Sequence, residues 1–423
     1  MRILYYHQHF STPEGATGTR SYEMARRLIA QGHKVSMVCG SYQVGKTGLT
    51  GEFKRGKRQG FVDGIHVIEF LLAYSNRDSF VKRSLTFFRF ALKSIWIALG
   101  HRYDLIFATS TPLTAALPGI VARLVRRKPF VFEVRDLWPE LPREMGVIRN
   151  PIILKMIDIL EWVSYHSANA CIGLSPGIVQ GIKRRGIDAS KVAMIPNGCD
   201  LNLFNLEKHL ERPPTVMNTN DLVAIFTGSH GIANGLNAVL DAASELIHRG
   251  RREIKFVFIG HGKLKPELQQ RAGEENLDNC IFMDPVPKET LAHLMKSADI
   301  GLMILANVPA FYYGTSPNKF FDYISIGLPV LNNYPGWLAD MIRAHKCGLV
   351  VPPEDPIAFA DALEYLADNR HKLDTMGRNA RLLAEREFDC KRLADQFVDW
   401  LEKVQRSVIL PSQEPIVKEW ISP

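Results

Sequence analysis

The chain has 423 residues, of which 46% are hydrophobic and 23% are charged, an ordinary composition for a folded α/β protein of about two domains. Its six cysteines are scattered without a CxxC pair, which argues against a disulfide framework or a structural zinc site and favours a reducing cytoplasm. Because no signal-peptide pattern and no charge-free run of about 18 apolar residues is present, we expect neither secretion nor a membrane-spanning helix.

Charge is distributed unevenly along the chain. Residues 1–205 carry 28 Lys and Arg against 15 Asp and Glu, whereas the remainder carries 24 against 29. A basic first half predicts an anionic partner, such as a diphosphate-bearing substrate or an anionic membrane surface, with plain solvated charge as the alternative. No nucleic acid is expected, because aromatic and basic residues are not interleaved in a recognisable module.

In the first half, short apolar runs alternate with helical patterns. Strands are predicted at residues 3–7, 34–39, 64–70, 105–109, 130–134 and 170–174. Helices are predicted at residues 20–31, 80–99, 113–126 and 152–166. Alternation of this kind favours a doubly wound parallel sheet with helices on both faces.

A second alternation follows the polar, proline-containing segment 207–220, which we interpret as a linker. Strands are predicted at residues 223–227, 255–260, 281–283, 300–305, 329–332 and 349–351. Helices are predicted at residues 235–249, 263–272, 288–297, 318–326, 337–344, 356–368 and 390–404. Two such units predict domains at 1–205 and 206–389 with a cleft between them, and a final helix near 390–410 packed back on the first domain.

Two glycine-containing turns each join a strand to a helix. Residues 14–20 include Gly15 and Gly18 and end at Arg20, and residues 259–263 include Gly260 and end at Lys263. Glycine lets backbone N–H groups approach a phosphate, a helix N-terminus favours negative charge, and arginine offers a fork of donors. Neither turn is Gly-x-Gly-x-x-Gly, so an ordinary tight turn remains the alternative.

A third candidate is the run Ser316-Pro317-Asn318-Lys319, with Asp322 three residues further on. Ser316 is expected to cap a helix that begins at Pro317. Lys319 would then lie in the first turn, where a cation opposes the helix dipole unless an anion binds there. Lys319 and Asp322 share a helix face, so they suit a nucleotide sugar, or alternatively form a surface ion pair.

Taken together, the motifs resemble those of a retaining glycosyltransferase of family four with the GT-B fold. The resemblance rests on residues 15–20, 30–35, 196–200 with Phe204, 259–262, 327–330 and 376–380, and it spans about residues 1–405. It implies an acceptor-binding first domain and a second domain that binds a nucleotide sugar as co-substrate, with no other cofactor. The run at residues 133–140 and the Ser-Pro-Asn-Lys turn resemble the branch that adds sugars such as N-acetylfucosamine in O-antigen and capsule assembly.

The sequence departs from the family pattern at its usual charged positions. Gly314 and Asp322 stand where the family shows two glutamates, and Ser229 and Asn234 stand where it shows Arg and Lys. The family's first-domain His is also absent. We therefore expect Lys319, with Lys263, to supply the missing positive charge.

The resemblance assigns the following site residues. Donor binding is expected from Gly228, Ser229, Gly260, Lys263, Val286, Ser316, Pro317, Asn318, Lys319 and Asp322. Acceptor binding is expected from Gly15, Thr17, Gly18 and Arg20. Catalytic roles are expected for Lys319, Asp136 and Arg135.

The expected activity is transfer of a sugar, with retention, from a UDP-linked donor to a glycan or a polyprenyl-diphosphate-linked acceptor in bacterial surface polysaccharide synthesis. No Asp-x-Asp occurs, so fixed cations and helix N-termini should stabilise the leaving diphosphate without a metal. A sugar-nucleotide 2-epimerase of the same fold and a non-catalytic scaffold are the alternatives.

On the predicted helix at residues 80–99, Lys82, Arg89 and Lys93 lie near one face, and the apolar residues of the other face are Leu85, Phe88, Leu92, Ile95, Trp96 and Leu99. That pattern is typical of a core helix, and it also suits a helix lying on a membrane surface. The second interpretation places the protein on the inner face of the cell membrane.

Overall fold

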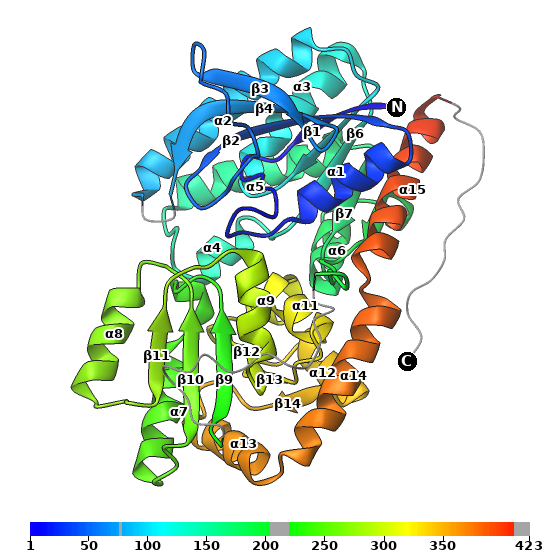
Figure 1. Ribbon diagram of the computed structural model, residues 1–423. Coiled ribbons are helices and arrows are strands. Elements are labelled where there is room, and N and C mark those ends of the chain that lie inside the picture. Colours follow the sequence, from blue (N-terminus) through cyan, green and yellow to red (C-terminus); the bar gives the residue numbers. More distant parts are fainter. Residues whose placement is uncertain (76–77, 204–219, 410–423) are drawn as a thin grey trace.

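The computed structural model describes residues 1–75, 78–203 and 220–409, and it contains one mainly parallel and one parallel sheet, both covered by helices (Figure 1). The strands of the first sheet lie within residues 2–194 and those of the second within residues 222–350. This confirms the predicted α/β fold. Phe204, the predicted linker at 207–219 and the proposed boundary at 205/206 lie outside the described residues.

The first sheet has eight strands in the order β3-β4-β2-β1-β5-β6-β7-β8, and every neighbouring pair is parallel except β3 with β4. Its strands are β1 (Arg2–Tyr6), β2 (Lys34–Tyr42), β3 (Lys57–Val62), β4 (Ile65–Tyr74), β5 (Leu105–Thr109), β6 (Phe130–Val134), β7 (Ala170–Gly173) and β8 (Val192–Met194). Strands β5 and β6 are buried along their whole length, as expected where helices cover both faces.

The helices of the first half lie on the two faces of this sheet. They are α1 (Arg20–Ala30), α2 (Phe80–Gly100), η1 (Leu113–Ala116), α3 (Leu117–Arg126), α4 (Glu140–Glu144), α5 (Pro151–Ser167), α6 (Pro176–Arg184) and η2 (Ala189–Lys191). Helices α2, α3 and α5 contact one another in that order and form one layer against the sheet, whereas α1 packs against β2 and against the C-terminal helix.

The second sheet has six parallel strands in the order β11-β10-β9-β12-β13-β14. Its strands are β9 (Leu222–Thr227), β10 (Ile254–Ile259), β11 (Cys280–Met283), β12 (Ile300–Met303), β13 (Val330–Asn332) and β14 (Gly348–Val350). The helical segments around it are η3 (Ile232–Asn234), α7 (Asn237–His248), α8 (Lys265–Glu274), α9 (Lys288–Lys296), α10 (Pro309–Gly314), α11 (Asn318–Ser325), α12 (Trp337–His345) and α13 (Pro356–Asp368).

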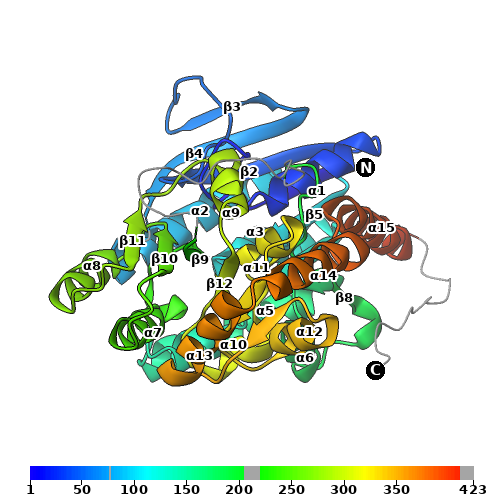
Figure 2. The same cartoon turned by 60° about the horizontal axis from the view of Figure 1, so that its bottom comes forward.

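Helices α14 (His371–Glu387) and α15 (Cys390–Ile409) carry the chain from the second sheet back to the first (Figures 1 and 2). Helix α15 packs along α1, where the guanidinium of Arg27 donates to both carboxylate oxygens of Asp395 at 2.5 and 2.7 Å. At the start of α15, the backbone N–H of Cys199 donates to the carbonyl of Phe388 at 2.6 Å. The two halves are therefore joined by hydrogen bonds between side chains and between backbone groups.

Strand β3 was not predicted, although its turn carries a strong signal. Asp63 and Gly64 connect β3 to β4 with φ values of 50° and 84°. A two-residue Asp-Gly turn with positive φ at both positions is the typical connection of a β-hairpin. The charged sequence of β3 hides the strand, because an edge strand need not alternate apolar and polar residues.

Candidate active site

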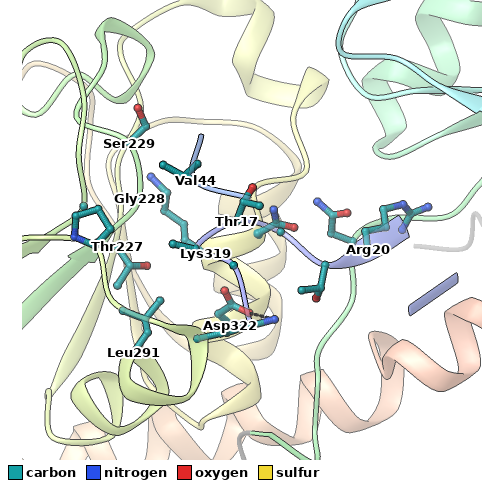
Figure 3. A pocket seen from close by; sticks show the side chains of 18 of the residues that line it. Thr17, Arg20, Val44, Thr227, Gly228, Ser229, Leu291, Lys319 and Asp322 are labelled. Atoms are coloured by element: carbon teal, nitrogen blue, oxygen red, sulfur yellow. Dashed lines mark ion pairs between the residues drawn. The ribbon is translucent and has the colours of Figure 1, made fainter. Parts of the chain in front are cut away.

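A cleft of about 470 Å³ lies between the two sheets at the carboxyl ends of their strands. That volume lies within the range of small-molecule sites. The first half contributes residues 15–20 and the second half contributes the loops after β9 and β10 and the start of α11 (Figure 3). All four predicted acceptor residues, Gly15, Thr17, Gly18 and Arg20, line this cleft.

Gly18 lies close to the second half of the chain. A Cβ at Gly18 would lie 2.6 Å from Nδ2 of Asn318, the first residue of α11. Close packing also requires a glycine at position 15. A Cβ at Gly15 would overlap the Ser11 hydroxyl and lie 2.8 Å from the backbone nitrogen of Lys46. These glycines therefore shape the loop against its neighbours.

The guanidinium of Arg20 is engaged by the first half of the chain. Its Nη2 and Nε donate to Oε2 of Glu133 at 2.8 and 3.0 Å, and it also donates to the carbonyls of Ile195 and Pro196 at 2.8 and 2.6 Å. Burial raises the pKa of Glu133, but Arg20 and Arg135 outweigh it and hold that pKa below its usual value. Arg20 thus holds Glu133 and the 195–196 backbone in place, although its side chain reaches the cleft wall.

Arg135 and Asp136, both predicted to be catalytic, follow β6 but are not among the residues that line the cleft. Arg135 Nε donates to the Thr109 hydroxyl at 2.7 Å and to Glu133 at 3.2 Å. Asp136 accepts from the Thr111 hydroxyl at 3.4 Å, and burial raises its pKa despite the nearby Arg135. Both residues belong to the carboxyl edge of the first sheet.

The loops after β9 and β10 pack closely against each other on the side of the cleft formed by the second half of the chain. Gly260 has φ +151°, and a Cβ there would overlap the carbonyl oxygen of Gly228. A Cβ at Gly262 would overlap the backbone of His230, whose ring is fully buried among the rings of β9, β10 and β11. Burial lowers the pKa of His230 to about 4, so the imidazole is neutral at physiological pH.

Lys319 extends from the first turn of α11 toward Gly228 (Figure 3). Its Nζ donates to Oδ1 of Asn234 at 2.6 Å and lies 4.0 Å from the ring centroid of Phe226. Within the described part of the chain, no carboxylate forms an ion pair with it. Burial lowers the pKa of Lys319 to about 7.

Asp322 pairs with a different lysine than the sequence suggested. Its Oδ1 lies 3.7 Å from Nζ of Lys288, in the first turn of α9. Burial raises the pKa of Asp322, and Lys288 partly offsets the rise. Burial lowers the pKa of Lys288, but the carboxylates of Asp322, Asp200 and Glu23 outweigh it and leave that pKa raised.

Sequence reasoning missed Lys288, although the signal that found Lys319 was present. Both lysines occupy the first turn of a helix that follows a proline, where a cation opposes the helix dipole. Both line the same cleft.

The predicted cap of α11 was wrong. Pro317 stands at the N-cap position without a side-chain hydrogen bond, and the helix begins at Asn318. The Ser316 hydroxyl instead accepts from the backbone N–H of Asn197 at 3.1 Å, and the Asn197 side chain donates to the Ser316 carbonyl at 2.5 Å. A contact with the first half therefore satisfies the hydroxyl that local reasoning assigned to the helix.

The remaining predicted donor residues divide into two groups. Gly228, Ser229, Gly260, Val286, Asn318, Lys319 and Asp322 line the cleft, whereas Lys263, Ser316 and Pro317 do not. Lys263 is exposed, and Lys265 is the buried lysine of this loop, donating to the Gly260 carbonyl at 3.1 Å and to Asp284 at 2.7 Å. No group of three or more metal-ligating side chains is found in the described ranges.

Two sheets that face each other across this cleft, together with the matching solved structures, define the GT-B fold. A glycosyl transferase 4-like domain matches residues 15–198, and the family described as glycosyl transferases group 1 matches residues 221–369. These two matches cover more than half of the chain. The protein therefore belongs to the GT-B glycosyltransferases of the family-four type, and it is an enzyme.

Among curated relatives, WcaI of Escherichia coli K12, named for glycosyl transfer in colanic acid biosynthesis, is 23% identical over 77% of this chain and 82% of its own. O-antigen chain mannosyltransferase C of Escherichia coli is 22% identical over 60% of this chain and 66% of its own, just under two thirds of its length. Each of these proteins is therefore similar to this chain over more than half of its length.

Among solved structures, sucrose-phosphate synthase from Thermosynechococcus elongatus aligns with a TM-score of 0.73 at 17% identity, covering 97% of this chain and 100% of that one. HepE of Anabaena in complex with UDP and glucose aligns with a TM-score of 0.68 at 18% identity, covering 95% and 99%. At these identities the likeness establishes the fold.

Proposed function

We propose that the enzyme transfers a sugar, with retention of anomeric configuration, from a nucleotide diphosphate sugar onto a growing bacterial surface polysaccharide. The observation that carries this proposal is Lys319, a lysine held between Phe226 and Asn234 in the cleft without a carboxylate partner in the described chain. A desolvated cation of this kind favours an anionic ligand, because a bound anion restores the interactions that burial removed.

The donor diphosphate is proposed to lie against the loop at Gly228, the N-terminus of α11 and the ammonium of Lys319. Backbone N–H groups at a helix start and a fixed cation are the elements that bind phosphate in proteins. UDP is the favoured nucleotide, since HepE shares the fold and its structure contains UDP. Asp322 and Val286 line the same cleft, where we propose that they contact the ribose and the base.

During transfer, negative charge develops on the leaving diphosphate while the sugar becomes oxocarbenium-like. Lys319 is proposed to stabilise that charge, and the leaving phosphate to accept the proton of the attacking hydroxyl on the same face of the sugar. Preorganised positive groups in a desolvated site act without reorganisation. The reaction is therefore proposed to need no metal: activity should persist in EDTA, and loss of activity that manganese restores would contradict this.

The acceptor is proposed to approach from the first sheet, past residues 15–20. Arg135 and Asp136 follow β6 at the carboxyl edge but do not line the cleft, and we propose that they orient the acceptor hydroxyl or the sugar from that edge. We propose a glycan or polyprenyl-diphosphate-linked acceptor, consistent with the naming of WcaI for colanic acid biosynthesis, and a working position at the inner face of the cell membrane. The sugar is proposed to be an N-acetylated amino or deoxy sugar.

A thermal-shift screen with UDP, GDP and dTDP compounds tests the donor assignment. A saturating ligand raises the melting temperature, because it binds only the folded state. We expect the largest shift with UDP and a UDP sugar, and a smaller shift for Lys319→Met at the same ligand concentration. Incubation of a UDP sugar without acceptor then separates transfer from epimerisation, since an epimerase converts the donor alone.

A further inference from the structure

The layer formed by α2, α3 and α5 presents an unusually apolar outer face. More than half of the exposed large apolar side chains in the described residues lie on these three helices. They are Val81, Leu85, Phe88, Leu92 and Trp96 on α2, Leu124 and Val125 on α3, and Ile152, Met156, Ile159 and Trp162 on α5. We call this set the outer apolar face; α2 contacts α3 and α3 contacts α5, so the helices that carry it are neighbours.

Helix α2 shows why this face is not an ordinary helix exterior. Phe90, Ala91 and Ala98 are buried against the sheet side, whereas Phe88 and Trp96 remain 52% and 76% exposed on the opposite side. Leu85, Phe88, Leu92 and Trp96 of the predicted apolar stripe therefore point outward, whereas Ile95 and Leu99 are half-buried. A helix that covers a sheet normally shows a polar outer face, and a large exposed apolar patch marks an interaction site.

Charge decides what this face is suited to contact. Residues 80–130 contain nine Lys and Arg but only one acidic residue, Asp104, which pairs with Arg2 at 2.6 Å. Arg89, Lys93 and Arg127 are exposed and form no ion pair within the described chain. Two copies of this face would bring like charges together, which disfavours a second copy of the protein as the partner.

The carboxylates of α5 do not offset these cations. Asp158 lies 3.0 Å from Lys155 and 2.6 Å from Arg185, and Glu161 is buried beside Arg185 at 2.6 Å. Lys82 is the one cation of α2 held by a described carboxylate, that of Asp78. The outer apolar face is thus rimmed by positive charge.

We infer that the outer apolar face docks on a lipid bilayer containing anionic phospholipid. Apolar side chains would enter the boundary between headgroups and acyl chains, while the surrounding cations contact the headgroups. No described helix is long and apolar enough to cross a membrane, so the contact is a surface one. This inference deepens the membrane position proposed above, because it names the surface and the lipid, and it does not depend on how the donor is bound.

The position of the outer apolar face relative to the cleft links membrane docking to the proposed activity. Helix α2 begins at Phe80, shortly after Ser75, which lines the cleft. A helix of 21 residues extends about 30 Å, so the outer apolar face runs from the cleft edge along the first domain. A lipid-linked acceptor in the same bilayer would reach the cleft without leaving the membrane surface.

Cosedimentation of the full chain with vesicles tests this inference. Vesicles of phosphatidylcholine with phosphatidylglycerol should bind the protein at low salt, whereas phosphatidylcholine alone should bind it weakly and high salt should release it. The variant Phe88→Ser/Trp96→Ser should lose binding at least tenfold. The variant Arg89→Gln/Lys93→Gln/Arg127→Gln should lose about a hundredfold, since each basic residue near such a surface contributes about fivefold.

Ile357→Ser on α13 is the matched control, because Ile357 is 57% exposed outside the outer apolar face. It should bind vesicles like the unmodified protein. Absence of binding at low salt, or unchanged binding by both multiple variants, would overturn the inference. The inference would also be overturned if the protein were a dimer in solution and Phe88→Ser/Trp96→Ser dissociated that dimer. Circular dichroism and thermal unfolding check that each variant is folded. Lys319→Met should bind vesicles normally, so failure of either proposal is separately visible.

Discussion

The Nζ atom of Lys319 donates to Oδ1 of Asn234 at 2.6 Å, and the Asn234 side chain in turn donates to the Ser229 carbonyl at 2.7 Å. Ser229 and Asn234 are the positions where the family resemblance would place Arg and Lys. The loop that contains Ser229 and Asn234 lacks these cations, and Lys319 from α11 places a cation beside it. A Cβ at Gly228 would lie 3.8 Å from the same Nζ, so the ammonium lies against the turn itself.

Replacing Lys319 should impair the chemical step. Lys319→Ala is expected to lower kcat by about 100- to 1,000-fold, the usual loss when one charge-stabilising group is removed. Steady-state kinetics with a UDP sugar measure this. Lys263→Ala is the matched control, because Lys263 is exposed and does not line the cleft, and its kcat should stay within about twofold. Equal losses in both variants would remove Lys319 from its assigned role.

The lowered pKa of Lys319 gives UDP binding a defined pH dependence. In the free enzyme burial holds this pKa near 7, and a bound diphosphate raises it because it favours the charged form. Above pH 7, binding must therefore take up a proton, so affinity should fall by up to about tenfold per pH unit. Calorimetric titration from neutral to alkaline pH measures the slope, which should vanish in Lys319→Met.

Lys288 should set the acid limb of the pH–rate profile through Asp322. Burial already raises the pKa of Asp322, and Lys288 at 3.7 Å is the group that offsets it. Lys288→Met should therefore raise that pKa further and move the acid limb of kcat/KM toward higher pH. Lys288→Arg keeps the charge and should leave the limb nearly in place. A limb that does not move in either variant would exclude Asp322 as the titrating group.

The ion pair between Arg20 and Glu133 should dominate the stability of the first domain. Glu133→Gln leaves Arg20 buried without its counter-charge and is expected to lower the free energy of unfolding by about 3–5 kcal/mol. Arg406→Gln is the control, since Arg406 pairs with Glu402 on an exposed helix face and should cost less than about 1 kcal/mol. Denaturant unfolding measures the free energy of unfolding of both variants. Similar losses would mean that burial does not determine how much the Arg20–Glu133 ion pair contributes to stability.

Local patterns in the sequence predicted most of the fold. Apolar runs located β5 and β6 to the residue, because strands buried on both faces carry no polar alternation. The edge strand β3 escaped detection because its sequence, which begins with Lys57 and Arg58, contains no apolar run, although the Asp63-Gly64 turn would have identified it.

Residues of the candidate site were predictable where their position in their own helix carried the signal. Lys319 was found because a cation in a first helical turn is unfavourable without an anion, and Lys288 carries the same signal. Arg20 could not be interpreted in this way, because its partner Glu133 lies 113 residues away in sequence. Ser316 likewise bonds to Asn197 across the cleft wall instead of capping its own helix.

Titration of UDP into the protein in the presence of EDTA tests the central claim most directly. If Lys319 and the helix N-terminus hold the diphosphate without a metal, the unmodified enzyme should bind UDP in EDTA, and Lys319→Met should bind about a hundredfold more weakly. Binding that requires manganese and is the same in both proteins would contradict the account.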